Sequence, residues 1–465
     1  MELLAPAMFV CLVAALFVGF PVAFSLAAIA GVFGLIGVVT GRFEASFLSA
    51  IFFRVQGLFN NDNLLALPML VFMGLLLERT GIAEGMFISL NRLFGRVPGG
   101  LAYTTVIVGA VLSGITGFVS ASVIAIGLIA LPVMLRSGYD HRLASGVVAA
   151  TGTLAQVIPP SLVLIVLAEQ MDVSVTDLYR GALVPSLLLI GAYLAYVFVL
   201  TQMSPDTAPP DRSLSTGRAI GPLVGQALIA AGLPLGLVIV VLATIYLGVA
   251  TPTEGGAIGV TGTLLLGLLR SRLTLEKLHQ AMVATGILVS GLMFLLMGAS
   301  FFTLVFRGLD GQRWIQALFS HIPAGEIGFV IFVSLSVFLI AFVLDFFEIA
   351  FIVLPLIVPV AQHLGVDMIW LTILLAVNLQ TSFMHPPFGI AIYNLRSITP
   401  STVRTVDIYW GAVPFLCIQL VMVGLLILVP QLVLKPPPPA SVSPRDINII
   451  IPPFLETPGS VSPWK

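Results

Sequence analysis

Charged side chains are scarce in this chain. Only 9% of its 465 residues are Asp, Glu, Lys or Arg, whereas 58% are hydrophobic; a typical soluble protein carries about 25% charged residues. This composition excludes an ordinary soluble domain, because the chain has too few charged groups to cover a water-facing surface. The net charge of −1 argues against nucleic acid as a partner. Long apolar runs predict an all-α protein that crosses a lipid bilayer several times.

Motifs of several enzyme classes are also absent. The sequence contains no Gly-x-x-x-x-Gly-Lys-Ser/Thr loop, which argues against transport driven directly by ATP in this chain. It contains no His-Glu-x-x-His motif of a metalloprotease and, in its apolar runs, no Gly-x-Gly-Asp motif of an aspartyl protease. These absences argue against an intramembrane protease. The two cysteines, Cys11 and Cys417, lie in apolar runs and indicate nothing about redox compartment. We expect a protein that is not an enzyme and has no cofactor.

Two double prolines, Pro159-Pro160 and Pro386-Pro387, interrupt apolar runs of helical length. Proline lacks a backbone donor and clashes with the carbonyl one turn earlier, so each pair should break its helix. Inside a bilayer, such a break is tolerated only where it is buried in protein or lines a cavity. Matching breaks in two halves of a membrane protein indicate a transport site.

A long apolar run precedes each break. The first is interrupted by the Ser/Gly/Thr-rich segment 113–122, and the second by Asp345 and Glu348. Basic residues lie at both ends of the first run, which favours a re-entrant hairpin with both ends on one side of the membrane. We predict hairpins over about 101–135 and 327–360, and broken helices over about 143–167 and 368–394.

The two halves also repeat short phrases in the same order. Tyr-Arg-Gly-Ala-Leu-Val-Pro at 179–185 corresponds to Tyr-Trp-Gly-Ala-Val-Pro at 409–414, and Ile-Ala-Leu-Pro at 129–132 to Ile-Val-Leu-Pro at 352–355. With the N-terminus outside, most Lys and Arg residues fall in the cytoplasm and the hairpins open from opposite sides. The halves are therefore predicted to be inverted repeats. The expected divisions are a first repeat over 1–200, a cytoplasmic linker over 201–221, a second repeat over 222–434, and a proline-rich tail over 435–465 without regular structure.

The first hairpin and first break combine hydroxyl groups with small residues. The candidate residues there are Ser113, Gly114, Thr116, Gly117, Ser120, Ser122, Thr153, Pro159, Pro160 and Ser161. Hydroxyls and unwound carbonyls are oxygen ligands that suit a sodium ion, and helix N-termini suit an anionic substrate. The alternative for segment 113–122 is a small-residue seam along which helices pack.

The second hairpin and second break offer carboxylates and amides. The candidate residues there are Asp345, Glu348, Asn378, Thr381, His385, Pro386 and Pro387. Carboxylates inside a membrane are costly, which indicates ion ligands or proton carriers unless they cap the hairpin tip in water. Asn378 and Thr381 share a helix face. For His385, contact with an anionic or aromatic substrate, a pH switch and a neutral hydrogen-bonded ring all stay open.

These motifs resemble the large membrane subunit of tripartite ATP-independent periplasmic (TRAP) transporters, within the wider ion-transporter superfamily. The resemblance covers residues 5–434 and includes Leu-Ala-Leu-Pro at 65–68, Arg-Ser-Gly-Tyr-Asp at 136–140, Ile-Pro-Pro-Ser at 158–161 and Asn-Leu-Gln-Thr-Ser-Phe at 378–383. Segments 75–84 and 378–389 are most similar to the branch commonly labelled mannitol/chloroaromatic, a label that says little about the substrate.

The resemblance implies an elevator, in which both hairpins and both broken helices move against a scaffold. It implies sodium near Ser113, Gly117 and Pro159, and near Asp345, Thr381 and His385. It further implies a small membrane subunit (Q-type), a soluble periplasmic binding protein (P-type) that delivers an organic acid, and the bacterial inner membrane. At His385 the family more often has Thr, so the second sodium site would need backbone carbonyls or Thr381.

The sequence thus favours sodium-coupled uptake of a carboxylate. A proton-coupled anion transporter or exchanger of the same fold is the alternative, with Asp345, Glu348 or His385 as proton carriers. A channel is a third class, but inverted hairpins favour alternating access.

Overall fold

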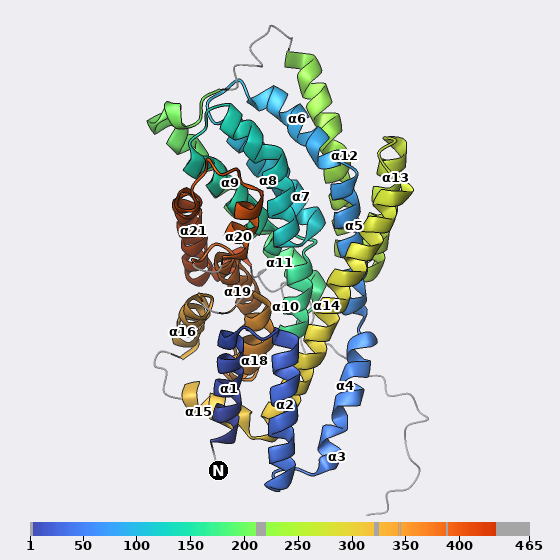
Figure 1. Ribbon diagram of the computed structural model, residues 1–465, viewed down its shortest axis with the longest axis vertical. Coiled ribbons are helices and arrows are strands. Elements are labelled where there is room, and N and C mark those ends of the chain that lie inside the picture. The colour runs from blue at the N-terminus through green and yellow to red at the C-terminus, as the bar shows by residue number, and fades with distance from the viewer. Residues whose placement is uncertain are drawn as a thin grey trace, which may run out of the picture.

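The computed structural model describes residues 3–210, 220–319, 325–342, 344, 346–386 and 389–433. All regular elements within these residues are helices, and they form an elongated bundle (Figure 1). Seven of the described helices are long and apolar enough to cross a membrane, or eight if the bent pair Ala45–Phe59 and Asp62–Arg79 is one span. The predicted all-α membrane fold is confirmed.

One group of helices extends from the upper right of Figure 1 to its lower end. Its members are α1 (Leu4–Val18), α2 (Val22–Val39), α3 (Ala45–Leu48), α4 (Ala50–Phe59), α5 (Asp62–Arg79), α6 (Ile82–Phe94), α12 (Ile220–Tyr246), α13 (Pro252–Leu269), α14 (Leu275–Gly308) and α15 (Gly311–Phe319). Glycines bring its helices into close contact. A Cβ atom added to Gly256 of α13 would lie 2.8 Å from Met69 Cβ of α5, and one added to Gly298 of α14 would lie 2.7 Å from Ala23 O of α2.

The second group contains both hairpins and both broken helices. From the first half it takes α7 (Gly100–Thr116), α8 (Val119–Arg136), α9 (His141–Thr153), η1 (Leu154–Gln156), α10 (Leu162–Met171), α11 (Val175–Met203) and η2 (Pro205–Thr207). From the second half it takes α16 (Gly325–Ile340), α17 (Phe346–Glu348), the π-helical turn η4 (Ile349–Val353), α18 (Leu354–His363), α19 (Met368–Ser382), α20 (Ile390–Ile398), α21 (Thr405–Leu428) and η5 (Pro430–Leu432). The predicted linker is described only outside residues 211–219, and the predicted tail lies outside the described residues.

The first hairpin is closed by a two-residue turn. Gly117 has a φ of +58°, which favours glycine, and Phe118 is extended at the start of α8. The two ends of the hairpin are tied to one segment, because Gly99 N donates to Ala208 O and Asp140 N to Thr207 O, each at 2.9 Å. The first hairpin occupies the upper part of Figure 1, whereas α16 and α18 of the second lie in the lower part, so the hairpins enter from opposite ends.

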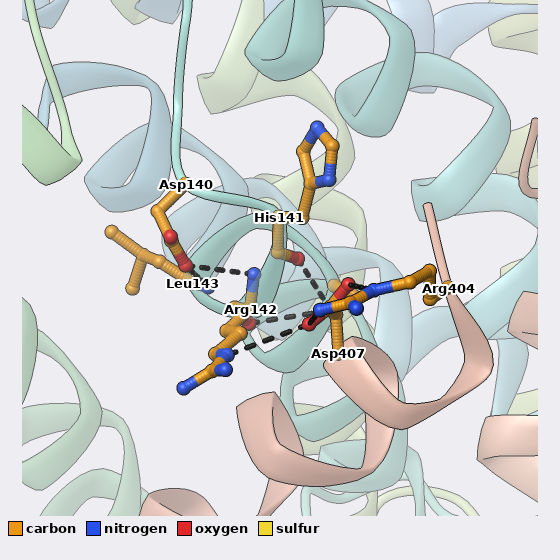
Figure 2. Close-up of polar contacts among 7 residues, drawn as sticks. Asp140, His141, Arg142, Leu143, Arg404 and Asp407 are labelled. Atoms are coloured by element: carbon orange, nitrogen blue, oxygen red, sulfur yellow. Dashed lines mark hydrogen bonds and ion pairs between the residues drawn. The ribbon is translucent and has the colours of Figure 1, made fainter. Parts of the chain in front are cut away.

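The two halves of the chain meet where α9 packs against α21. A Cβ atom on Gly146 would lie 2.1 Å from Gly411 O, and one on Gly411 would lie 2.0 Å from Arg142 O, so only glycine permits this approach. At the same end, Asp407 is 6% exposed and lies between Arg142 and Arg404 (Figure 2). Arg404 donates to both carboxylate oxygens, at 3.0 and 3.1 Å, and Arg142 lies 3.5 Å away.

Candidate functional site

The first break is an unwound segment held in place by hydroxyl groups. It separates η1 from α10, and its Pro159–Pro160 peptide bond is cis. Ser161 donates to Gln156 O (2.9 Å) and accepts from Leu164 N (3.4 Å), so one side chain closes the break and caps α10. From α11, Ser186 donates to Val157 O (2.9 Å) and Tyr179 to Ser161 O (3.3 Å). Three carbonyl groups beside the break, those of Gln156, Val157 and Ser161, therefore have side-chain partners.

The tip of the first hairpin packs directly against this break. A Cβ atom on Gly114 would lie 3.0 Å from Ile158 Cγ2 and 3.4 Å from Pro159 O. One on Gly117 would lie 2.9 Å from Leu162 N and 3.5 Å from Pro160 O. Gly114 and Gly117 of the hairpin tip therefore pack against the double proline of the break.

The hydroxyl groups of this hairpin are mostly buried. Ser113 donates to Thr151 O of α9 at 3.1 Å, and the hydroxyls of Thr116 and Ser122 are hydrogen-bonded to each other across the turn. Ser113 and Ser122 are fully buried, whereas Ser120 is partly exposed. The tip thus presents hydroxyl and carbonyl oxygens, which suit a hard cation, beside an unwound helix end.

The second break lies between α19 and α20. Asn378 Nδ2 donates to Ser334 O of α16 at 2.7 Å, which ties the broken helix to its hairpin. Thr381 Oγ1 donates to Asn378 O at 2.6 Å, and both residues are buried. Glu348 lies half-buried at the end of α17, and Pro386 is exposed. The predicted site residues Asp345 and Pro387 lie outside the described residues.

His385 is packed between aromatic rings. Its imidazole is 1% exposed and stacks on Phe342, with centroids 4.3 Å apart and planes 17° apart. Phe338, one helical turn earlier, meets the same ring edge-on at 4.6 Å. The ring thus fixes the arm of the second hairpin against the second break.

A buried polar cluster joins the two broken helices. Thr153 stands six residues before Pro159, and Gln380 stands six residues before Pro386. Gln380 Nε2 donates to Thr153 Oγ1 at 3.0 Å, so two residues at the same distance from their respective double prolines touch each other. Gln419 Nε2 donates to Tyr193 OH (2.9 Å) and Thr153 Oγ1 (3.2 Å). The cluster is fully buried.

Both hairpin tips reach one cavity of about 240 Å³. Phe118 of the first tip, Leu162 directly after the first break and Phe347 of the second tip line it on one side. Val71 of α5 and the segment 287–295 of α14 supply the other lining residues. Hairpins that enter from opposite ends and are far apart in sequence thus meet at one chamber between the two groups of helices.

Residues 9–432 match the family model of the tripartite ATP-independent periplasmic transporter, DctM component. The chain belongs to this family. It is therefore a large permease of the TRAP type, a multi-pass protein of the bacterial inner membrane and not an enzyme.

Relatives of this permease carry several different substrate names. The "C4-dicarboxylate TRAP transporter large permease protein DctM" of Pseudomonas aeruginosa is 27% identical, over 80% of this chain and 86% of that one. The "sialic acid TRAP transporter large permease protein SiaM" of Vibrio cholerae is 24% identical, over 91% and 96%. The "ectoine/5-hydroxyectoine TRAP transporter large permease protein UehC" of Ruegeria pomeroyi is 26% identical, over 80% and 85%.

A solved transporter has a similar fold. The crystal structure of the Alcanivorax borkumensis YdaH transporter, described as having an unusual topology, superimposes with a TM-score of 0.60. It is 17% identical in sequence and covers 89% of this chain and 97% of its own. At this identity the similarity concerns the fold alone.

Within this DctM-type permease, sequence reasoning missed two members of the buried polar cluster. Tyr193 and Gln419 lie in the apolar helices α11 and α21, outside the interrupted segments. Gln419 could have been found from the sequence, because it is a single glutamine in a long apolar run. A buried polar side chain in a membrane helix needs a partner. Its partner Thr153 is 266 residues away, so only the fold identifies it.

Proposed function

We propose that this permease mediates sodium-coupled secondary uptake of an organic acid by alternating access. The observation that supports this function is the meeting of both hairpin tips, at Phe118 and Phe347, in one cavity. A central site reached by inverted hairpins from opposite ends is the arrangement that alternating access requires.

Sodium is the coupling ion in this proposal. The first ion would lie near Ser113, Gly117 and Pro159, because the carbonyl oxygens of Pro159 and Pro160 lie beside the glycines of the hairpin tip. The second would lie near Thr381 and His385, together with Asp345. Because His385 packs between phenylalanine rings, the oxygen ligands at the second site would come from backbone carbonyls and Thr381.

An elevator is the proposed movement. Hydrogen bonds from Gln380 to Thr153 and from Gln156 Nε2 to Ala376 O (2.9 Å) join the two broken helices to each other. The chamber wall on α14, in contrast, is apolar. This supports a movement in which the second group of helices shifts as one body against α14, because the α14 residues that line the chamber are apolar.

The family implies a small membrane subunit and a periplasmic binding protein as partners. By analogy with its relatives, the transported molecule is a small organic acid. The branch labelled mannitol/chloroaromatic remains a prediction from residues 75–84 and 378–389. The apolar lining around Phe118 and Phe347 supports a substrate with an apolar body as well as a carboxylate.

The test is uptake into proteoliposomes that contain the permease, its small subunit and its binding protein. Labelled succinate, sialic acid, ectoine and benzoate serve as probes, each with an inward sodium gradient or with choline in its place. We expect uptake of one probe to depend on sodium. Uptake that persists in choline and follows only the pH gradient would contradict sodium coupling and favour the proton-coupled alternative.

A further inference from the structure

A second, larger cavity of about 460 Å³ lies farther along α14. Residues 287–295 of α14 line the apolar chamber, and residues 296–307 line this second cavity. Gly291 and Thr303, one from each lining, are twelve residues apart, which is about 18 Å along a helix. The remaining wall comes from α4, from α15, from the end of α10 and from α18. The cavity thus lies between the two groups of helices, on the side predicted to face the periplasm.

Two arginines face this cavity. Arg54 of α4 and Arg307 of α14 both line it, and they lie close enough to repel each other. Neither guanidinium group has a hydrogen bond or an ion pair with another described residue. Glu169 also lines the cavity, but one of its oxygens accepts from Asn61 Nδ2 at 2.7 Å. Asp172 also lines the cavity, and among the described residues neither carboxylate forms an ion pair with Arg54 or Arg307.

Hydroxyl groups lie beside the arginines. Ser300 and Thr303 precede Arg307 at helical spacing, so the three side chains share one face of α14. Neither hydroxyl has a hydrogen-bond partner among the described residues. A face that combines a guanidinium fork with free hydroxyls matches the oxygens of a carboxylate, which arginine binds through two parallel hydrogen bonds.

We infer that Arg54 and Arg307 form a binding site for the carboxylate group of a small soluble anion, separate from the chamber between the hairpin tips. Such an anion would relieve the repulsion between two like charges and satisfy their donors together with Ser300 and Thr303. Its position along α14 makes it an entry site, from which a carboxylate moves on to the tips.

The site is tested by chemical protection of its arginines. The full chain is placed in phosphatidylcholine nanodiscs and treated with phenylglyoxal, and modification of each arginine is measured by peptide mass spectrometry. Succinate is the probe, and succinamide is its neutral analogue. We expect succinate to slow modification of Arg54 and Arg307 about tenfold, which corresponds to about 1.4 kcal/mol, and succinamide to have no effect. Equal protection of Arg313, an exposed arginine nearby, or no protection at Arg54 and Arg307 would overturn the inference.

Variants and lipids sharpen the test. In R54Q, succinate should no longer protect Arg307, and in R307Q it should no longer protect Arg54, because both forks are needed. R313Q is the matched control and should keep the protection. If R54Q fails to fold, R54K serves in its place and should reduce the protection of Arg307. If phosphatidylglycerol alone protects both arginines and succinate gives no further protection, a lipid headgroup occupies the site. The assignment of the site to a soluble anion would then be wrong.

Anion binding at Arg54 and Arg307 does not depend on which ion drives transport. The protection is measured without an ion gradient, so a permease that proved to use protons would still show it. Conversely, a change at the first hairpin tip, such as Gly117→Val, should abolish uptake and leave the protection of Arg54 and Arg307 unchanged.

Discussion

At the first break, three hydroxyl groups bind the unwound backbone, whereas at the second break an imidazole ring stacks on one phenylalanine and meets another edge-on. Ser161 and Tyr179 each donate to one carbonyl group beside the break, and Ser186 shares its proton between Val157 O and Ala182 O of its own helix. Such bonds constrain the direction of the carbonyl groups that accept them. The contacts of His385 with Phe338 and Phe342 depend on ring area and tolerate small displacements. The two breaks are therefore supported by different chemistry.

This difference suggests different tasks for the two breaks. A fixed set of carbonyl directions suits an ion site, because cation coordination depends on where oxygens point. A stacked aromatic cluster suits a surface that rearranges as its hairpin moves. Transport should therefore depend on the exact backbone geometry at the first break. At the second break, stability should depend on the volume of the His385 ring.

The largest effect is expected for Gly117→Val. The new side chain would need a φ of +58° and would bring Cβ to within 2.9 Å of Leu162 N, so the tip must move away from the break. We expect a loss of about 2–4 kcal/mol in the free energy of unfolding, and loss of uptake. Equilibrium unfolding in detergent micelles and proteoliposome uptake measure the two effects.

Gly191→Val on α11 is the matched control, because a Cβ atom there meets open space. Stability and uptake of this variant should be close to those of the original chain. A Gly117→Val protein with full uptake would show that contact between the first tip and the first break is not needed for transport.

The second effect concerns His385. His385→Ala removes a buried ring and leaves a cavity beside Phe338 and Phe342, which should cost about 2–4 kcal/mol. His385→Phe keeps the aromatic contacts and should stay within about 1 kcal/mol of the original. Unfolding in micelles measures both. If His385→Phe is as unstable as His385→Ala, a polar contact of the imidazole matters more than its stacking, and the comparison of the two breaks fails.

Much of the fold followed from local signals, but the contacts between the halves did not. Apolar runs interrupted at 113–122 and at Pro159-Pro160 predict a hairpin and a broken helix because lipid tolerates unwound backbone only where protein covers it. The pairing of Gly146 with Gly411 depends on how α9 and α21 approach, and no local pattern contains that information. Arg54 likewise looks like an ordinary interfacial arginine until the fold places Arg307 beside it.

Thr153→Val should have a smaller effect than the changes above. The change removes Thr153 Oγ1, which accepts hydrogen bonds from the side-chain amides of both Gln380 and Gln419. Both buried amides then lose this acceptor. We expect a loss of about 1–2 kcal/mol. Adding Gln380→Leu removes one of those stranded amides, so the double variant should lose less than the sum of the two single changes. Unfolding in micelles measures this coupling energy; strict additivity would mean that Thr153 and Gln380 do not stabilise the junction of the two breaks together.

The smallest effect is expected for Ser186→Ala, which removes one hydroxyl that supports the first break. Val157 O would lose its partner, and a side-chain hydrogen bond in a membrane protein contributes about 0.6 kcal/mol on average. The control is Ser290→Ala, since Ser290 is exposed and bonds only to Ile287 O of its own helix. We expect Ser186→Ala to raise the sodium concentration required for half-maximal uptake and Ser290→Ala to leave it unchanged. A Ser186→Ala protein with the original sodium dependence would mean that Ser186 supports the backbone of the first break without defining an ion site.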